Sequence, residues 1–346
     1  MQILTERNKS ILQAVIMGYI EEAEPVSSGT VALRYNTGVS PATIRNTMSE
    51  LEEMGYLRQP HTSAGRIPTA KGFRFYVDSI IKLKELSSPE KKKIRSRYHA
   101  GGDIETLMKE TSALLSDHSM CIGVALPPRF DTIIIDHIEL IGVGVRQLMV
   151  IVISEAGIAH TKVVHVDDNL TQSVLTMMAE YLNNIAKGVT LQEVRKRVIK
   201  EMRSERRLYD KIIKKILQIS DAVLKGRKDE EIYVEGRANI LNQPDFVKDA
   251  EMLKDIFEAF ERKSILLKFL DNTIEKKGVH IFIGSESENN EIKGLSLVTS
   301  TYGSGVYATG TVGVMGPMRM DYLKIIPIVD YIARLLSEIL TEKGVS

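Results

Sequence analysis

The side chains best placed for chemistry lie in one short stretch, residues 40–57. Ile44, Met48 and Leu51 recur at spacings of four and three residues, which predicts a helix with one apolar face. Ser40 and the proline after it fit the start of that helix, because a serine hydroxyl accepts a free backbone N–H and proline has no N–H to leave unpaired. The opposite face near this start carries small and hydrogen-bonding side chains. They are Ala42, Thr43, Arg45 and Asn46.

Side chains of these types suit a helix end that enters the major groove of DNA. Arginine can make two hydrogen bonds to guanine, and asparagine can make two to adenine. Ser40 would then contact a phosphate at the helix start. The same pattern also fits an ordinary amphipathic surface helix, so the neighbouring segments must decide between the two interpretations.

The segments before this stretch predict two further helices. A capping threonine precedes a predicted helix over residues 6–21, and Ser27 or Ser28 can cap a short helix over residues 29–35. A tight turn at residues 36–38, which ends in glycine, then leads into the helix described above. Two helices, a turn and a third helix in this order form the helix-turn-helix arrangement.

The segment after Gly55 predicts a small β-ribbon with its tip near residues 63–65, which makes the whole a winged helix. Residues 55–77 contain four basic and no acidic residues, whereas residues 1–54 contain four basic and seven acidic residues. A surface that binds phosphates needs such segregation of charge, and the alternative is a solvated loop with chance positive charge. The residues expected to contact the DNA backbone or the minor groove are His61, Ser63 and Arg66.

The rest of the chain changes in character after residue 102. A further amphipathic helix begins near Pro68, a basic run at residues 90–97 fits a solvated helix face, and two glycines at 101–102 mark a boundary. Beyond them the pattern is mixed α/β. We predict helices over residues 104–116, 170–186 and 321–341, and strands over residues 133–143, 147–154, 158–166, 279–284, 296–300 and 306–314.

Residues 190–277 differ from their flanks because their pattern is almost all helical, with an apolar seam among lysines and arginines. Such a segment predicts an insertion that docks on other helices, of this chain or of a second copy. The predicted fold class is therefore α+β and multidomain. The predicted divisions are a winged-helix DNA-binding domain at 1–87, a linker at 88–102, an α/β domain in two parts at 103–189 and 278–346, and the insertion at 190–277.

Composition and motif content exclude several classes of function. The chain of 346 residues is 43% hydrophobic and 26% charged and has no run long enough to span a membrane, so we expect a cytoplasmic multidomain protein. Its single cysteine, Cys121, excludes an internal disulfide, and the apolar residues around it predict a buried structural thiol. No nucleophile, metal-ligand or phosphate-loop motif occurs, and the glycine-rich residues 303–316 fit a twisted hairpin. We expect no catalytic residue, no metal and no cofactor.

Five segments resemble the family of heat-inducible transcription repressors named HrcA. Residues 38–57 (GVSPATIRNTMSELEEMGYL) are similar to the recognition helix of that family, and residues 59–78 (QPHTSAGRIPTAKGFRFYVD) to its wing and the following helix. Residues 234–246 (VEGRANILNQPDF), 294–302 (GLSLVTSTY) and 312–322 (VGVMGPMRMDY) resemble signatures further along. The resemblance therefore covers almost the whole chain in the same order.

The resemblance implies a homodimer whose subunits have a winged helix, a GAF-like α/β domain and an inserted dimerising domain. It implies binding to double-stranded DNA at the CIRCE inverted repeat upstream of chaperone operons, and loss of repression on heating. It also implies that the GroE chaperonin keeps the repressor folded. No membrane partner is implied.

Three other functions remain as alternatives to a repressor of this kind. A metabolite-responsive regulator would bind an effector in the α/β domain, and that ligand would change both the melting temperature and the DNA affinity. An enzyme with the winged helix as a targeting arm would need the nucleophile, metal or phosphate motifs that the sequence lacks. A winged helix used only for protein contact would not need the basic ribbon or the polar face of residues 42–46.

Overall fold

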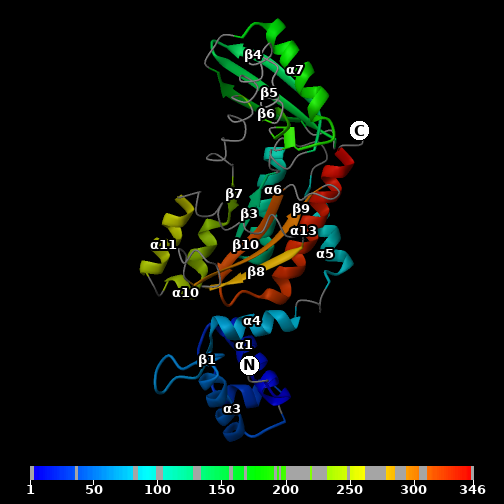
Figure 1. Cartoon of the computed structure of the whole chain (residues 1–346). Coiled ribbons are helices and arrows are strands. Elements are labelled where there is room, and N and C mark those ends of the chain that lie inside the picture. The colour runs from blue at the N-terminus through cyan, green and yellow to red at the C-terminus, as the bar shows by residue number, and fades with distance from the viewer. Residues whose placement is uncertain are drawn as a thin grey trace.

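The protein forms three parts in a row (Figure 1). The winged helix lies at one end, a five-stranded sheet with helices on both faces lies in the middle, and a three-stranded sheet with one long helix lies at the other end. The structure is a computed structural model. It describes residues 4–35, 38–80, 85–98, 104–127, 134–155, 159–166, 170–190, 193–194, 196–199, 219, 232–247, 250–261, 278–284, 294–303 and 310–343.

The winged helix forms as the residue pattern predicts. Ser40 accepts the Thr43 N–H at 3.3 Å, and the caps at Thr5 and Ser27 are made in the same way. Gly55 adopts φ +76° directly after the third helix, a backbone conformation that glycine adopts without strain. The elements are α1 (Glu6–Glu22), α2 (Ser28–Arg34), α3 (Pro41–Glu53), β1 (Leu57–Arg58), β2 (Ile67–Pro68) and α4 (Ala70–Ile80).

The central sheet is antiparallel, with the strand order β7-β3-β10-β9-β8. One face packs against α6 and α13, and the other packs against the segment that holds α10 and α11. Because both faces are covered, β3, β9 and β10 are buried almost without interruption. The bounds are α5 (Ser88–Arg95), α6 (Ile104–Ser119), β3 (Ile122–Leu126), β7 (Tyr233–Glu235), η2 (Arg237–Asn242), α10 (Pro244–Val247), α11 (Ala250–Glu261), β8 (Val279–Ile283), β9 (Leu295–Tyr302), β10 (Gly310–Pro317) and α13 (Tyr322–Lys343).

The outer sheet has the order β4-β5-β6, and its core is formed with α7 (Gln172–Ala186). Its strands are β4 (Ile135–Gly144), β5 (Gln147–Ser154) and β6 (Ala159–His165). Burial alternates along β5, as expected for a strand with one face toward a core. Asn183 of α7 accepts the N–H of Ile138 at 2.7 Å and donates to its carbonyl at 2.9 Å, which fixes the helix against β4.

Strand pairing differs from the predicted division of the chain. The three strands between Ile135 and His165 were expected to share a domain with the strands after Val279, but the structure places them in a separate sheet. The insertion into the central sheet therefore begins after β3 rather than at Thr190. Strand β7 also lies inside the segment predicted to be almost all helical. The physical reason is that strands of both sheets have the same Ile- and Val-rich pattern, which does not specify their partners.

The other helices and strands predicted for this half of the chain form within a few residues of the predicted bounds where the structure describes them. The final helix continues through Pro327, and Cys121 is buried as a free thiol. Parts of three predicted features lie outside the described residues, namely the connection between the strands predicted at 147–154 and 158–166, the glycine-rich segment at 303–316 and most of the helical seam at 200–231. Within the described residues, no helix is long and apolar enough to cross a membrane.

Candidate nucleic-acid interface

Helix α3 is anchored through one face and open on the other. Ile44 and Leu51 are fully buried, and Met48 is 3% exposed, so the predicted apolar face packs on α1 and α2. Ala42, on the opposite face, is exposed. The first turn of α3 carries no acidic side chain, so the positive end of its helix dipole faces outward uncompensated. A negatively charged group is stabilised at such an end.

Two of the α3 side chains predicted to read bases are exposed and have no polar partner among the described residues. Arg45 and Asn46 both lie on the outer face, and neither side chain makes a hydrogen bond or ion pair with any described residue. Thr43 is half-buried, and its hydroxyl lies 3.0 Å from that of Ser40. The sequence-predicted residues of α3 are therefore brought together at one solvent-facing helix end, where the polar groups are available to a ligand.

The wing is a short ribbon held to α3 by one carboxylate. Leu57 pairs with Pro68 and Arg58 with Ile67. The Gln59 N–H donates to Glu52 Oε1 at 2.8 Å, and the Gln59 side-chain amide donates to two carbonyls of the loop, at 3.0 and 2.9 Å. These bonds stiffen the loop from within. His61 and Ser63 are left exposed in this loop. Figure 1 shows the loop projecting from the same end of the molecule as α3.

This geometry agrees with the comparisons with known proteins. Residues 3–79 match the profile described as "Winged helix-turn-helix transcription repressor, HrcA DNA-binding", and residues 105–326 match "HrcA protein C terminal domain". The chain belongs to the HrcA family. A heat-inducible transcription repressor HrcA of Geobacter sulfurreducens is 45% identical over 97% of this chain and 98% of the relative. The relative of the same name from Syntrophobacter fumaroxidans is 41% identical over 99% of each chain.

A solved structure shares the fold of this HrcA-family chain. It is a crystal structure of a hypothetical protein at 2.2 Å resolution, 24% identical, which covers 99% of this chain and 100% of its own with a TM-score of 0.64. The similarity at this level of identity concerns the fold alone.

The side chain of Arg66 in this HrcA-family chain was expected to contact the DNA backbone or the minor groove, but it lies against another residue of the protein. Its guanidinium Nε lies 2.8 Å from Glu52 Oε2, and the side chain is only 15% exposed. Its backbone N–H and carbonyl both bond to Val26, each at 2.9 Å. Arg66 therefore holds the wing to α3 and to the segment after α1. The sequence shows the charge of Arg66, but it does not show that the chain brings Glu52 beside it.

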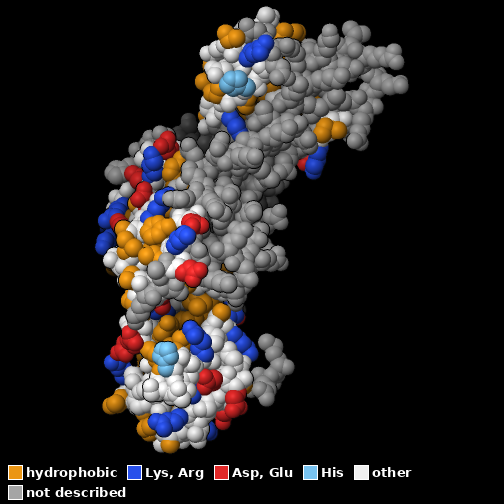
Figure 2. Space-filling view, turned by 90° about the vertical axis from the view of Figure 1, so that its left-hand side faces the viewer, with side chains coloured by type: hydrophobic (Ala, Val, Ile, Leu, Met, Phe, Trp, Pro, Cys, Tyr) orange, Lys and Arg blue, Asp and Glu red, His pale blue; other side chains and the backbone are white. Residues whose placement is uncertain are grey.

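Other basic residues that contribute to the charge count are also used inside the protein. Lys71 donates to the Met54 carbonyl at 2.7 Å and lies 4.3 Å from the centre of the Tyr56 ring. Arg74 donates to the Ile281 carbonyl at 2.6 Å, which ties α4 to the central sheet. Arg58 is exposed, and sequence reasoning counted it without selecting it as a contact. Figure 2 shows basic and acidic side chains interspersed over this end of the molecule.

Replacing Arg66 by alanine is expected to lower the free energy of unfolding by about 1–3 kcal/mol, because the half-buried Glu52 carboxylate loses its cation. Urea unfolding of the full chain measures this loss. Arg45→Ala is the matched control, since that side chain is exposed and makes no hydrogen bond or ion pair with a described residue, and we expect a change within about 0.5 kcal/mol. Equal midpoints for the two variants would contradict the anchoring role of Arg66.

Proposed function

We propose that this chain is a sequence-specific transcription repressor that acts in the cytoplasm and binds the CIRCE inverted repeat upstream of chaperone operons. The observation that carries the proposal is the outer face of α3, where Arg45 and Asn46 are exposed and make no hydrogen bond or ion pair with the described residues. The relatives named heat-inducible transcription repressor HrcA support the same role.

In this proposal the residues divide into those that read bases and those that hold the backbone. Arg45 and Asn46 make paired hydrogen bonds to base edges in the major groove, and Ala42 allows close approach or contacts a thymine methyl group. Thr43 assists as a base or near-base contact. Ser40, His61 and Ser63 contact the backbone, whose phosphates are also attracted by the open end of α3.

An inverted repeat requires a two-fold dimer that presents two recognition helices about 34 Å or a multiple of this distance apart. The outer sheet supplies support for self-association. Ile141 of β4, Met149 of β5 and Val163 of β6 are paired across the sheet and point away from the α7 core, and Ile141 and Val163 are 38% and 52% exposed. We propose that this sheet belongs to the inserted dimerising domain and that the central sheet is the GAF-like domain.

The heat response follows, in this proposal, from the stability of the folded dimer. Only the folded dimer can bind both half-sites, so unfolding at high temperature removes repression by mass action. In the central sheet β3 pairs with β7 and with β10, which are both far from it in sequence, and such long-range pairing slows folding and favours aggregation of intermediates. Dependence on the GroE chaperonin for refolding fits such a chain.

A gel-shift titration tests the proposal directly. We expect the full-length protein to bind a CIRCE duplex at least 1000-fold more tightly than a scrambled duplex, within the usual range for specific binding. Heating should remove this binding, and GroE should restore it after cooling. Equal affinity for the two duplexes at both temperatures would refute the proposed function.

A further inference from the structure

Two of the family-like segments have no part in DNA contact, yet they meet each other beside the winged helix. Asp245 comes from residues 234–246 and Arg319 from residues 312–322. Arg319 Nε lies 2.5 Å from Asp245 Oδ2, although the two residues are 74 positions apart. Asp245 also accepts a hydrogen bond from the Tyr19 hydroxyl of α1 at 3.5 Å. The pair therefore joins both signatures to the first helix of the DNA-binding part.

The guanidinium of Arg319 contacts two separate segments with its three nitrogens. Besides the bond to Asp245, one terminal nitrogen donates to the side-chain carbonyl of Gln243 at 3.1 Å and the other to the backbone carbonyl of Ile20 at 3.4 Å. The Ile20 carbonyl belongs to the last turn of α1, where helix carbonyls have no partner within the helix. Arg319 thus acts as a cap that the central part supplies to α1.

Charge explains why α1 needs this cap. The last turn of α1 contains no basic residue, and it ends with Glu21 and Glu22 at the negative end of the helix dipole. Arg34 of α2 pairs with Glu22, and Arg319 supplies a second positive charge at this end. Arg319 and Asp245 are 13% and 22% exposed, so removal of either partner leaves the other largely desolvated and unpaired. The pair is therefore sensitive to loss of one member.

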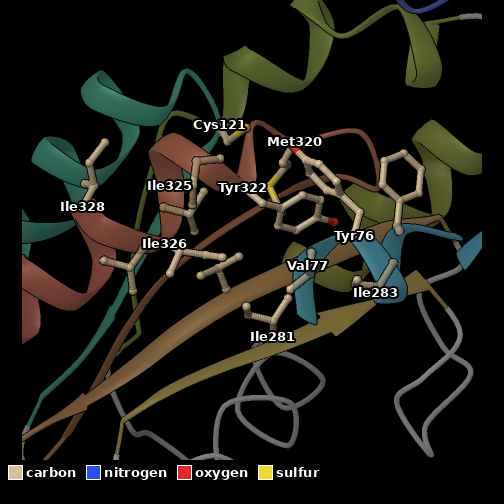
Figure 3. Close-up of a cluster of buried hydrophobic side chains, with 14 of the residues drawn as sticks. Tyr76, Val77, Cys121, Ile281, Ile283, Met320, Tyr322, Ile325, Ile326 and Ile328 are labelled. Carbon is tan, nitrogen blue, oxygen red and sulfur yellow. The ribbon is translucent and has the colours of Figure 1, made fainter. Parts of the chain in front are cut away.

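Apolar packing surrounds this polar junction. The Phe73 ring of α4 lies 6.3 Å from the rings of both Tyr19 and Tyr322, which places it between α1 and the start of α13. Figure 3 shows Tyr76 and Val77 of α4 in the same buried cluster as residues of β8 and α13. Apolar contact holds the two parts together but is not directional, whereas the bonds of Arg319 depend on the angle between them.

We propose that Asp245 and Arg319 form a latch that holds the winged helix at one fixed angle on the central part, so that they are positioning residues for operator binding. The inference rests on the proposed function, because a fixed angle matters when the winged helices of two subunits must reach two half-sites together. When both winged helices are held at the right angle, binding of the first half-site gives the second winged helix a high effective concentration at the second half-site. Loosely held winged helices lose this advantage.

A DNA titration tests this consequence with full-length Asp245→Asn and Arg319→Ala variants. We expect at least tenfold weaker binding to the complete inverted repeat, with less than twofold change for a duplex that contains one half-site. The double variant should be no worse than Arg319→Ala alone, because the same latch is lost. Arg334→Ala is the matched control, since its ion pair with Asp330 is exposed on α13, and it should bind as the unaltered protein does.

Operator spacing separates a positioning role from a general loss of structure. Insertion of two base pairs between the half-sites should weaken binding of the unaltered protein at least tenfold but that of the Asp245→Asn variant less than threefold. A variant that is only partly folded would lose affinity equally for the half-site duplex, the original inverted repeat and the repeat with the insertion. This result would overturn the latch. Unchanged binding and unchanged spacing preference in both variants would also overturn it.

A measurement without DNA distinguishes the latch from the proposed function. Spin labels on Thr62→Cys in the wing and Glu251→Cys in α11 report the distance between the two parts, with labelled chains diluted in unlabelled ones. Burial raises the pKa of the Cys121 thiol to about 11, so that thiol stays protonated and unlabelled near pH 7.5. We expect a narrow distance distribution that broadens in Asp245→Asn. A broader distance distribution in Asp245→Asn supports the latch even if the unaltered protein does not bind the inverted repeat. An unchanged distance distribution refutes the latch.

Discussion

Replacement of both Arg45 and Asn46 by alanine is expected to weaken binding to the inverted repeat by about 30-fold or more. Each bidentate contact between a side chain and a base contributes about 1–3 kcal/mol of discrimination, so the two losses together come to about 2–6 kcal/mol, and 2 kcal/mol corresponds to about 30-fold. The two side chains are exposed and engage no described residue, so the free energy of unfolding should stay within about 0.5 kcal/mol. Fluorescence anisotropy with labelled duplexes measures the affinity.

The single variants distinguish sequence-specific base contacts from non-specific attraction to the DNA phosphates. Asn46→Ala should relax the preference at one operator position, whereas a variant that loses only a phosphate contact should weaken all sequences alike. Glu53→Gln at the opposite end of α3 is the matched control, because this exposed residue lies far from the helix start, and we expect less than threefold change. If the double alanine variant binds as tightly as this control, α3 does not read the operator.

Replacement of Gly123 by alanine is expected to lower the free energy of unfolding by about 3 kcal/mol or more, because overpacking at a rigid site is not relieved by side-chain movement. A Cβ at this position would lie 1.9 Å from the backbone carbonyl oxygen of Ser112 and 2.8 Å from the backbone nitrogen of Ser116. Both atoms belong to α6, so the helix itself must move away from β3. Differential scanning calorimetry should show a melting temperature lower by about 10 °C.

Gly142→Ala provides the control for this glycine. Gly142 also lies in a strand, but the nearest atom to its added Cβ is a flexible Leu175 side-chain carbon at 3.6 Å, an ordinary contact distance. We expect a change of less than about 1 kcal/mol, since alanine there meets no backbone and removes freedom from the unfolded chain. Similar melting temperatures for the two variants would show that α6 adjusts to Gly123→Ala more easily than its packing suggests.

Local residue patterns predicted the DNA-binding part almost completely. The caps at Ser27 and Ser40, the apolar face of α3 and the glycine after it all depend on residues within a few positions of one another. Interactions over such short distances in sequence can be inferred from spacing alone. For the same reason most helices and strands after residue 103 were found within a few residues of their true ends.

These local patterns could not identify which residues or strands that are distant in the sequence interact with each other. The sequence by itself determined where α3 begins, which of its faces is apolar and that Ala42, Arg45 and Asn46 stay outside. Only the tertiary structure decided that Arg66 binds Glu52, that β4, β5 and β6 leave the central sheet, and that Arg319 caps α1 from another part of the chain. A charge or an apolar strand is compatible with many partners, and the choice among them depends on which surfaces the whole fold brings into contact.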